Sequence, residues 1–356
     1  MSLEEHRDRI DAIDQQVVAL LNERAQHALA IGKIKEDRAA PFYVPERERE
    51  VFARLQAVNA GPLPNNALAV IWREIMSAVR ALEKPTSVAF LGPRDTFSHL
   101  AARRVFGVSA DYHPMASFAD IFTEVERKRV DYGIVPIESA TGGSVGETLD
   151  RFVTSDVKVC NEVLLHVTQN LLSRSPLAEI GTVYSKDNAL FQCRNWLRAN
   201  LPAAQLREVS STAEAARRAA GEPGTAAIAS RMAAETYQLD IVCARIEDHP
   251  HNYTRFFVIG HQPVKPTGDD KTAIMVAGRN RAGELLTLLQ PFAEAGINLS
   301  KIESRPSRTK AWQYVFFIDF DGHVTDEPVQ AVLQHLEDRA LTVKILGSFP
   351  RAEMTE

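Results

Sequence analysis

The stretch that decides the fold reads Asn252-Tyr253-Thr254-Arg255-Phe256 and continues into the apolar run at 257–260. It puts a hydroxyl, a guanidinium and aromatic rings side by side where a loop becomes a strand. Such a junction can hold polar groups rigidly over a cleft. The arginine can grip a carboxylate with two hydrogen bonds, and the threonine can donate to a leaving oxygen. Residue types alone favour a plainer interpretation, an edge strand whose threonine caps a turn.

Two upstream segments share one pattern, an apolar strand followed by a polar loop and a helix. The first begins at Val88, and its loop holds Thr96 and Ser98. The second ends its strand at Ser139, and a glycine-rich loop follows at 141–146. Backbone amides at a helix start can bind an anion, and the hydroxyls add further donors. Two such loops facing one another would line a cleft that binds anions.

The order Asn-x-Thr-Arg-Phe resembles the signature of prephenate dehydratases, and the resemblance covers roughly residues 87–262. It implies two α/β lobes with a cleft, similar to periplasmic binding proteins, with Thr254 as the catalytic group. The first lobe would span about 88–165 and be completed by 250–262, and the second would span about 166–248. The residues that the resemblance assigns to the substrate prephenate are Thr96, Ser98, Ser139, Gln192, Thr254 and Arg255.

Residues 1–83 are predicted to form helices, the first of them over about 3–37. Arg24 and Lys35 are 11 residues apart, so at 100° per residue they share one helix face. Arg7 precedes Arg24 by 17 residues and therefore lies about 25 Å away along the axis, rotated by about 100°. If Arg7 is catalytic, it must reach a pocket built by another chain.

This geometry suits the intertwined dimer of helical chorismate mutases, which the segment resembles at 7–14, 20–24, 31–35, 45–49 and 71–83. Chorismate rearranges without covalent catalysis, so the enzyme must hold a dicarboxylate compactly and stabilise charge on the breaking ether oxygen. A carboxyl group can donate to that oxygen only if its pKa is raised. A solvated, charged helical bundle is the plainer alternative for any one of these residues.

The resemblance also implies roles for the mutase residues. Arginines would bind the carboxylates, and Lys35 with a protonated Glu83 would face the ether oxygen. Glu48 and the backbone at Val44 would hold the ring hydroxyl. The full set is Arg7 from the partner chain, Arg24, Lys35, Val44, Arg47, Glu48 and Glu83.

From about 271 to 350 the pattern alternates in the order βαββαβ, which predicts a ferredoxin-like split βαβ sandwich. One expected strand, at 312–320, places Trp312 and Tyr314 on the same face. The segment resembles the regulatory ACT module, whose phenylalanine-binding motifs correspond to Asn280, Gly283, Leu285, Glu303, Ser304 and Arg305. Glu284 stands where that family commonly has alanine, and a turn at a helix start would equally explain Gly283.

Composition agrees with a modular chain. At 356 residues, two or three domains are expected. The net charge of −5 gives no broad footprint for nucleic acid. Three widely spaced cysteines suit a reducing cytoplasm. The charged start and the absence of a long apolar run argue against a signal peptide or a membrane span. His249-Pro250-His251 has no partner at metal-ligand spacing, so no metal is expected.

Together these patterns predict a multidomain chain that resembles the bifunctional chorismate mutase–prephenate dehydratases. An all-α mutase domain would span 1–85, a two-lobed α/β dehydratase domain 87–262, and an α+β ACT domain 271–350. Chorismate and prephenate would be the substrates and phenylalanine the effector of a homodimer, or a higher homo-oligomer, that needs no cofactor. Asp95, Ser139 and Lys186 replace the family's usual Gly, Asn and His. They leave open an alternative, a mutase fused to lobes that only sense a ligand.

Overall fold

The computed structural model describes residues 1–37, 41, 43–279, 281–306 and 314–352. The chain divides into two compact units, Met1–Ser87 with Phe106–Asp111, and Val88–Val105 with Tyr112–Glu356. Trp312, which was expected on an apolar strand face, lies outside the described residues. In the part of the chain that the structure describes, no helix is long and apolar enough to cross a membrane.

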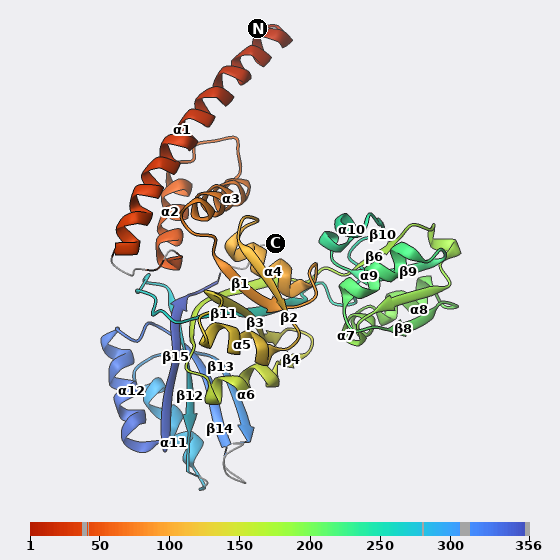
Figure 1. The fold of residues 1–356 in the computed structure, drawn as a ribbon. Coiled ribbons are helices and arrows are strands. Elements are labelled where there is room, and N and C mark those ends of the chain that lie inside the picture. The colour runs from red at the N-terminus through yellow and green to blue at the C-terminus, as the bar shows by residue number, and fades with distance from the viewer. Residues whose placement is uncertain (38–40, 42, 280, 307–313, 353–356) are drawn as a thin grey trace. The chain divides into compact units, whose positions relative to one another are not determined.

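The first unit is helical. Its helices are α1 (Leu3–Asp37), α2 (Pro45–Val58) and α3 (Asn65–Glu83). Figure 1 shows the N-terminal half of α1 extending beyond α2 and α3. Apolar side chains along this extension are exposed, for example Ile10 at 56% and Leu20 at 63%. A helix that leaves an apolar stripe in water is normally covered by another helix.

The second unit begins with the sheet of the first lobe, whose strand order is β2-β1-β3-β11-β5 with β4 paired to β3. Its elements are β1 (Ser87–Leu91), α4 (Phe97–Phe106), β2 (Asp111–Met115), α5 (Phe118–Glu126), β3 (Tyr132–Ser139), β4 (Gly143–Ser144), α6 (Gly146–Thr154), β5 (Lys158–His166) and β11 (Tyr253–Gly260). Residues 255–260 are all buried, as expected of a strand covered on both faces. The edge-strand interpretation is therefore wrong, because β11 lies between β3 and β5.

The second lobe is inserted between β5 and β11. Its sheet has the order β10-β6-β9-β7-β8. Its elements are β6 (Asn170–Ser173), the 3-10 helix η1 (Leu177–Glu179), β7 (Thr182–Ser185), α7 (Asp187–Gln192), α8 (Arg194–Asn200), β8 (Gln205–Glu208), α9 (Thr212–Gly221), β9 (Thr225–Ala229), α10 (Arg231–Tyr237) and β10 (Asp240–Cys243). Ser230 and Ser211 cap α10 and α9 by accepting backbone N–H bonds. The predicted two-lobed α/β architecture is confirmed.

The C-terminal part has the predicted βαββαβ order. Its elements are β12 (Asp270–Ala277), α11 (Glu284–Glu294), β13 (Leu299–Pro306), β14 (Tyr314–Asp321), α12 (Glu327–Arg339) and β15 (Thr342–Pro350). The antiparallel sheet order is β13-β14-β12-β15. The ferredoxin-like sandwich is confirmed, with α11 and α12 on one face of the sheet (Figure 1).

The other face of this sheet packs on the first lobe and forms one continuous core with it. The rings of Phe257 and Phe349 lie 5.2 Å apart across this contact. A Cβ at Gly347 would overlap the carbonyl oxygen of Val159, so β15 can approach β5 only with glycine there. The C-terminal sheet is thus joined directly to the sheet that carries Thr254.

Candidate active sites

Lys35 and Glu83 come together where the end of α1 meets the end of α3. Gly32 permits this approach, because a Cβ there would lie 3.0 Å from the Glu83 Cγ. Burial raises the pKa of Glu83, although Lys35 and Arg80 oppose the change. Burial likewise lowers the pKa of Lys35, with Glu83 opposing it. The raised pKa of Glu83 favours a protonated carboxyl, whereas the lowered pKa of Lys35 works against its ammonium form, which the neighbouring Glu83 supports. A protonated carboxyl beside an ammonium group is the pair needed at a developing negative oxygen.

Sequence reasoning missed Arg80 at this site. Its guanidinium forms an ion pair with Glu48, donates to the carbonyl oxygen of Phe106 at 3.1 Å and lies 5.5 Å from the ring centre of Tyr43. Glu48, expected to hold a ring hydroxyl, is thus engaged by an arginine. The available signal was spacing, since positions three apart on a helix share a face and Arg80 precedes Glu83 by three.

The predicted carboxylate-binding arginines occupy different environments. Arg24 has a buried Nη1 without a hydrogen-bond partner among the described residues. This is expected of a guanidinium that binds an anionic ligand. Arg47 pairs with Glu50 at 2.6 Å on the surface. Arg7 is exposed in the second turn of α1. The carbonyl oxygen of Val44, the N-cap of α2, accepts the N–H groups of Arg47 and Glu48.

In the first lobe, the sheet topology gathers the predicted dehydratase residues at one edge. β1 and β3 are parallel, so the loops that follow them leave the same edge of the sheet. β11 runs antiparallel to β3 and begins there, with Thr254 directly opposite Ser139. A register shift follows between Arg255 and Phe256. Such bulges re-aim side chains near functional sites.

A hydrogen-bond network extends from this edge into the second lobe. Gln192 donates to the Thr141 hydroxyl at 2.7 Å, and Asn252 donates to the Gln192 carbonyl at 3.2 Å. Gln169 donates to the same Gln192 oxygen at 2.9 Å, and the Ser139 and Thr141 hydroxyls are 3.2 Å apart. Sequence analysis chose Ser139 and Gln192 but missed the other three. Thr141 and Asn252 lay within quoted motifs, whereas nothing marked Gln169.

A pocket of about 420 Å³ opens beside this network. The pocket is lined by Thr141, Gln192, Arg194, Asp248, His249 and His251, among others. Arg194 is exposed, and its guanidinium lies 4.4 Å from the centre of the Phe191 ring. The carboxylate of Asp248 caps α8 by accepting the N–H groups of Asn195 and Trp196. Arg194 therefore presents a positive charge to any anion in the pocket.

Two of the predicted dehydratase residues have side chains engaged elsewhere. Thr96 directs its hydroxyl back into its own turn, to the carbonyl oxygens of Leu91 and Pro93 at 3.2 and 3.1 Å. Arg255 is buried on Glu162 and Asp319. Ser98 is partly exposed in the first turn of α4. Because successive side chains of a strand point to opposite faces, the structure does not bring Arg255 to the Thr254 hydroxyl.

The expected effector loop surrounds a second pocket of about 220 Å³. Gly283 is the N-cap of α11 with φ of 80°, a conformation that favours glycine, and Leu285 also lines the pocket. Asn280 lies outside the described residues. On β13, Glu303 accepts from Ser144 at 2.9 Å and Arg305 binds Asp150. Both therefore face the first lobe, while Ser304, between them, faces the other way.

The chain was then compared with known proteins. Family models match at residues 6–84 for chorismate mutase type II, 88–264 for prephenate dehydratase and 272–337 for the ACT domain. A bifunctional chorismate mutase/prephenate dehydratase of Aquifex aeolicus is 47% identical over 99% of both chains. The chain belongs to the bifunctional chorismate mutase/prephenate dehydratase family.

Two further relatives are similar to the whole chain and to its dehydratase and C-terminal parts. A protein of the same description from Neisseria gonorrhoeae is 46% identical, and the match covers 98% of this chain and 96% of the Neisseria protein. The crystal structure of the prephenate dehydratase of Arthrobacter aurescens, solved in complex with L-Phe, has a TM-score of 0.71 and 32% identity. It covers 75% of this chain and 90% of its own.

Local geometry explains two departures from the family pattern. Asp95 replaces the family's glycine and has φ of 68°, a left-handed conformation that aspartate tolerates better than most residues. Its N–H donates to Nδ1 of His99 at 3.0 Å, and burial lowers the pKa of His99 to about 4. His99 is therefore neutral near pH 7 and does not offset the charge of Asp95.

Glu284 stands where the ACT family commonly has alanine, in the loop expected to bind the effector. Its carboxylate accepts the backbone N–H of Arg279 at 2.8 Å and the Nε–H of Arg281 at 2.6 Å. These donors lower the pKa of Glu284, chiefly through the Arg279 N–H. The charge of Glu284 is thus already paired within the loop.

Among the described residues, no group of three or more His, Cys, Asp and Glu side chains could hold a metal ion.

Proposed function

We propose that this chain catalyses two consecutive steps, the rearrangement of chorismate to prephenate and the decarboxylating dehydration of prephenate to phenylpyruvate. The observation that carries the proposal is the near full-length similarity to bifunctional relatives, which includes both candidate sites. The domains would be a mutase domain at 1–85, a dehydratase domain at 87–262 and an ACT domain at 271–350.

The mutase site would act by compression and electrostatics. Arg24, whose Nη1 lacks a partner among the described residues, would bind one carboxylate of the substrate. Arg47 would release Glu50 and bind the other substrate carboxylate. Lys35 and protonated Glu83 would donate to the ether oxygen as its bond to carbon breaks. No proton is transferred and no intermediate forms, because the bonds break and form in one cyclic step.

The dehydratase site would assist departure of a hydroxyl group. As the ring carboxylate leaves as carbon dioxide, its bonding electrons enter the ring and the hydroxyl departs from the opposite carbon, which makes the ring aromatic. Thr254 would donate a hydrogen bond to that departing oxygen. An unperturbed threonine is a poor acid, so its role is orientation and charge stabilisation more than proton transfer. Arg194 would bind a carboxylate, since it provides a cation in the pocket.

Phenylalanine is the effector that we propose for the pocket at the N-terminus of α11. The dehydratase of Arthrobacter aurescens, which is similar over 75% of this chain, was solved in complex with L-Phe. The aromatic residues Tyr314 and Phe316 line this pocket together with Arg281. They would contact the ring of the amino acid, while the loop would bind its polar end.

We further propose a cytoplasmic homodimer. The exposed apolar stripe of α1, including Ile10, Val17 and Leu20, would be covered by a second copy of the chain. That copy would contribute Arg7 to the partner's mutase site. The cysteines Cys160, Cys193 and Cys243 form no disulfide among the described residues, which suits a reducing compartment.

The alternative is a mutase fused to lobes that bind a ligand without catalysis, as Asp95, Ser139 and Lys186 suggest. Purified protein given prephenate near neutral pH separates the two, because only an active dehydratase releases phenylpyruvate. Prephenate aromatises spontaneously in acid, so a reaction without protein is the control. Binding of prephenate without phenylpyruvate would support the sensor, and the binding itself would show that the two lobes are folded.

A further inference from the structure

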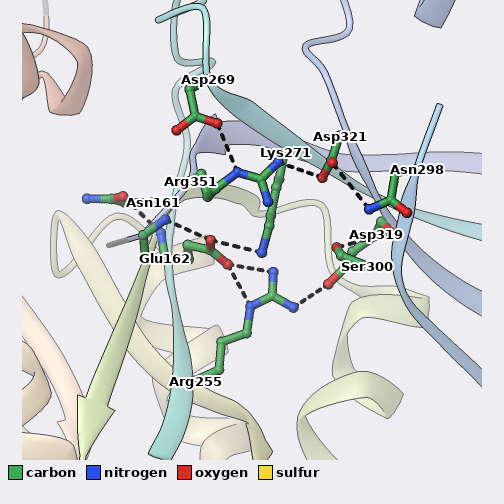
Figure 2. Close-up of polar contacts among 11 residues, drawn as sticks. Asn161, Glu162, Arg255, Asp269, Lys271, Asn298, Ser300, Asp319, Asp321 and Arg351 are labelled. Carbon is green, nitrogen blue, oxygen red and sulfur yellow. Dashed lines mark hydrogen bonds and ion pairs between the residues drawn. The ribbon is translucent and has the colours of Figure 1, made fainter. Parts of the chain in front are cut away.

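Arg255 lies at the centre of a buried cluster of charges between the first lobe and the C-terminal sheet (Figure 2). Its Nε donates to Glu162 Oε2 at 2.6 Å, and its Nη2 lies 2.6 Å from the same oxygen. Its Nη1 lies 2.5 Å from Asp319 Oδ2. Lys271 is 3.4 Å from the other Glu162 oxygen, which also accepts the N–H of Ala352 at 2.8 Å.

The cluster is balanced in charge and shared between domains. Arg255 and Glu162 come from β11 and β5 of the first lobe, whereas Lys271 and Asp319 come from β12 and β14 of the C-terminal sheet. Each part supplies one cation and one anion. The side chains of Glu162 and Asp319 are 0% and 5% exposed. A charge buried to this degree is retained only when it is paired.

This environment holds the guanidinium of Arg255 on two carboxylates. Its Nε and Nη1 donate to Glu162 and Asp319, and its Nη2 lies 2.6 Å from Glu162 Oε2 but has no hydrogen-bond partner among the described residues. One face of the group lies 4.8 Å from the centre of the Phe257 ring. Burial disfavours the charge, but the two carboxylates outweigh this and raise the pKa of Arg255. The group is fixed as a cation in one orientation.

Arg255 is also the residue next to Thr254, at the point where the pairing of β11 with β3 shifts register. A bulge re-aims the side chains beside it, and the anchored side chain of Arg255 holds the backbone at this point. The anchor on one face of the strand therefore determines where the neighbouring side chain emerges on the other face.

We infer that Arg255 is a positioning residue, held by Glu162 of its own lobe and by Asp319 of the C-terminal domain, which fixes the Thr254 hydroxyl for the dehydratase reaction. The C-terminal domain is therefore part of the active dehydratase, besides any effector that it binds. This inference rests on the proposed dehydratase activity.

The test compares Asp319→Asn with Asp321→Asn in the full-length chain. Asp321 lies two residues further along the same strand, 2.7 Å from the partly exposed Arg351, so it is a matched control outside the Arg255 contact. Misplacement of a reacting group by about 1 Å can lower turnover about 10²-fold. We expect Asp319→Asn to lower kcat for prephenate about 10- to 10²-fold with KM nearly unchanged, and Asp321→Asn to match the parent.

A double-mutant cycle separates positioning from general destabilisation. If Asp319 acts through Thr254, then Asp319→Asn should add little further loss in a protein that already carries Thr254→Val. A merely structural role would lower the residual activity again. Thermal unfolding of each variant reports whether the unit that contains position 319 is folded, because the mutase domain belongs to the other unit. Asp319→Glu, which keeps the carboxylate, should recover part of kcat.

Arg255→Lys tests the cluster from the other side and stands in if Asp319→Asn does not fold. Lysine keeps the positive charge but cannot contact both Glu162 and Asp319 as the guanidinium does, so kcat should fall while KM stays near the parent value. A raised KM with unchanged kcat would overturn the inference, because it would place Arg255 on the substrate. Parent kinetics for Asp319→Asn would also overturn it. A parent protein that forms no phenylpyruvate would instead contradict the proposed function.

Discussion

Gly32 on α1 lies so close to Glu83 on α3 that a Cβ at position 32 would stand 3.2 Å from the Glu83 carboxylate. Alanine is favoured over glycine in a helix by about 1 kcal/mol, so Gly32→Ala should not weaken α1 itself. It should displace the Glu83 carboxyl and lower mutase turnover about tenfold or more.

Chorismate consumption and thermal unfolding, measured on the same preparations, test this prediction. Phenylpyruvate formation from prephenate is the internal control and should stay at the parent rate. Parent mutase turnover in Gly32→Ala would show that Glu83 tolerates displacement and is not a close donor to the ether oxygen.

The pH dependence of the mutase follows from the raised pKa of Glu83. The donor is the protonated carboxyl, so activity is present below this pKa and is lost as pH rises through it. Glu83→Gln removes this ionisation and should move the falling limb to higher pH, where Lys35 loses its proton. Rate profiles of the parent and Glu83→Gln measure this shift. Superimposable profiles would exclude Glu83 as the controlling group.

The mutase site should be completed by two chains. Arg7→Ala and Lys35→Ala proteins should each be nearly inactive as mutases. In a mixed dimer one site carries both lesions and the other carries neither, because a two-fold dimer exchanges equivalent residues. Mixing the proteins under subunit exchange should therefore restore activity. Verified heterodimers that stay inactive would remove Arg7 from the partner's site.

The architecture could be predicted from the sequence because it depends on local periodicity. The βαββαβ order over 271–350 and the long helix near 3–37 need only the spacing of apolar residues and the positions of turns. The positions of Thr254 and Ser139 at strand ends could also be predicted, since both follow from motifs at those ends. That they lie directly opposite one another depends on sheet pairing, which no local pattern specifies.

Contacts between distant segments could not be predicted. Arg255 looked like a substrate ligand because its neighbours in sequence are Thr254 and Phe256, but Asp319, 64 residues away, determines where its charge lies. Arg80 was missed because its partner Glu48 comes from another helix. In both cases a buried arginine forms an ion pair with the nearest carboxylate, and the tertiary fold determines which carboxylate is nearest.

Arg194 should act as a carboxylate ligand for prephenate. A lost hydrogen bond to a charged group costs about 1.5–3 kcal/mol, so Arg194→Met should raise KM for prephenate by about tenfold or more. Arg198→Met, on the same helix but outside the pocket lining, is the control and should match the parent. An unchanged KM in Arg194→Met would place the substrate carboxylates elsewhere.

The most direct test gives chorismate to the Thr254→Val protein and follows prephenate and phenylpyruvate together. Valine keeps the shape and branching of threonine but lacks the hydroxyl, and loss of a preorganised donor lowers turnover by about 10²–10³. The account predicts that prephenate forms at the parent rate and accumulates, while phenylpyruvate formation near neutral pH falls by that factor. Phenylpyruvate formed at the parent rate would contradict the account.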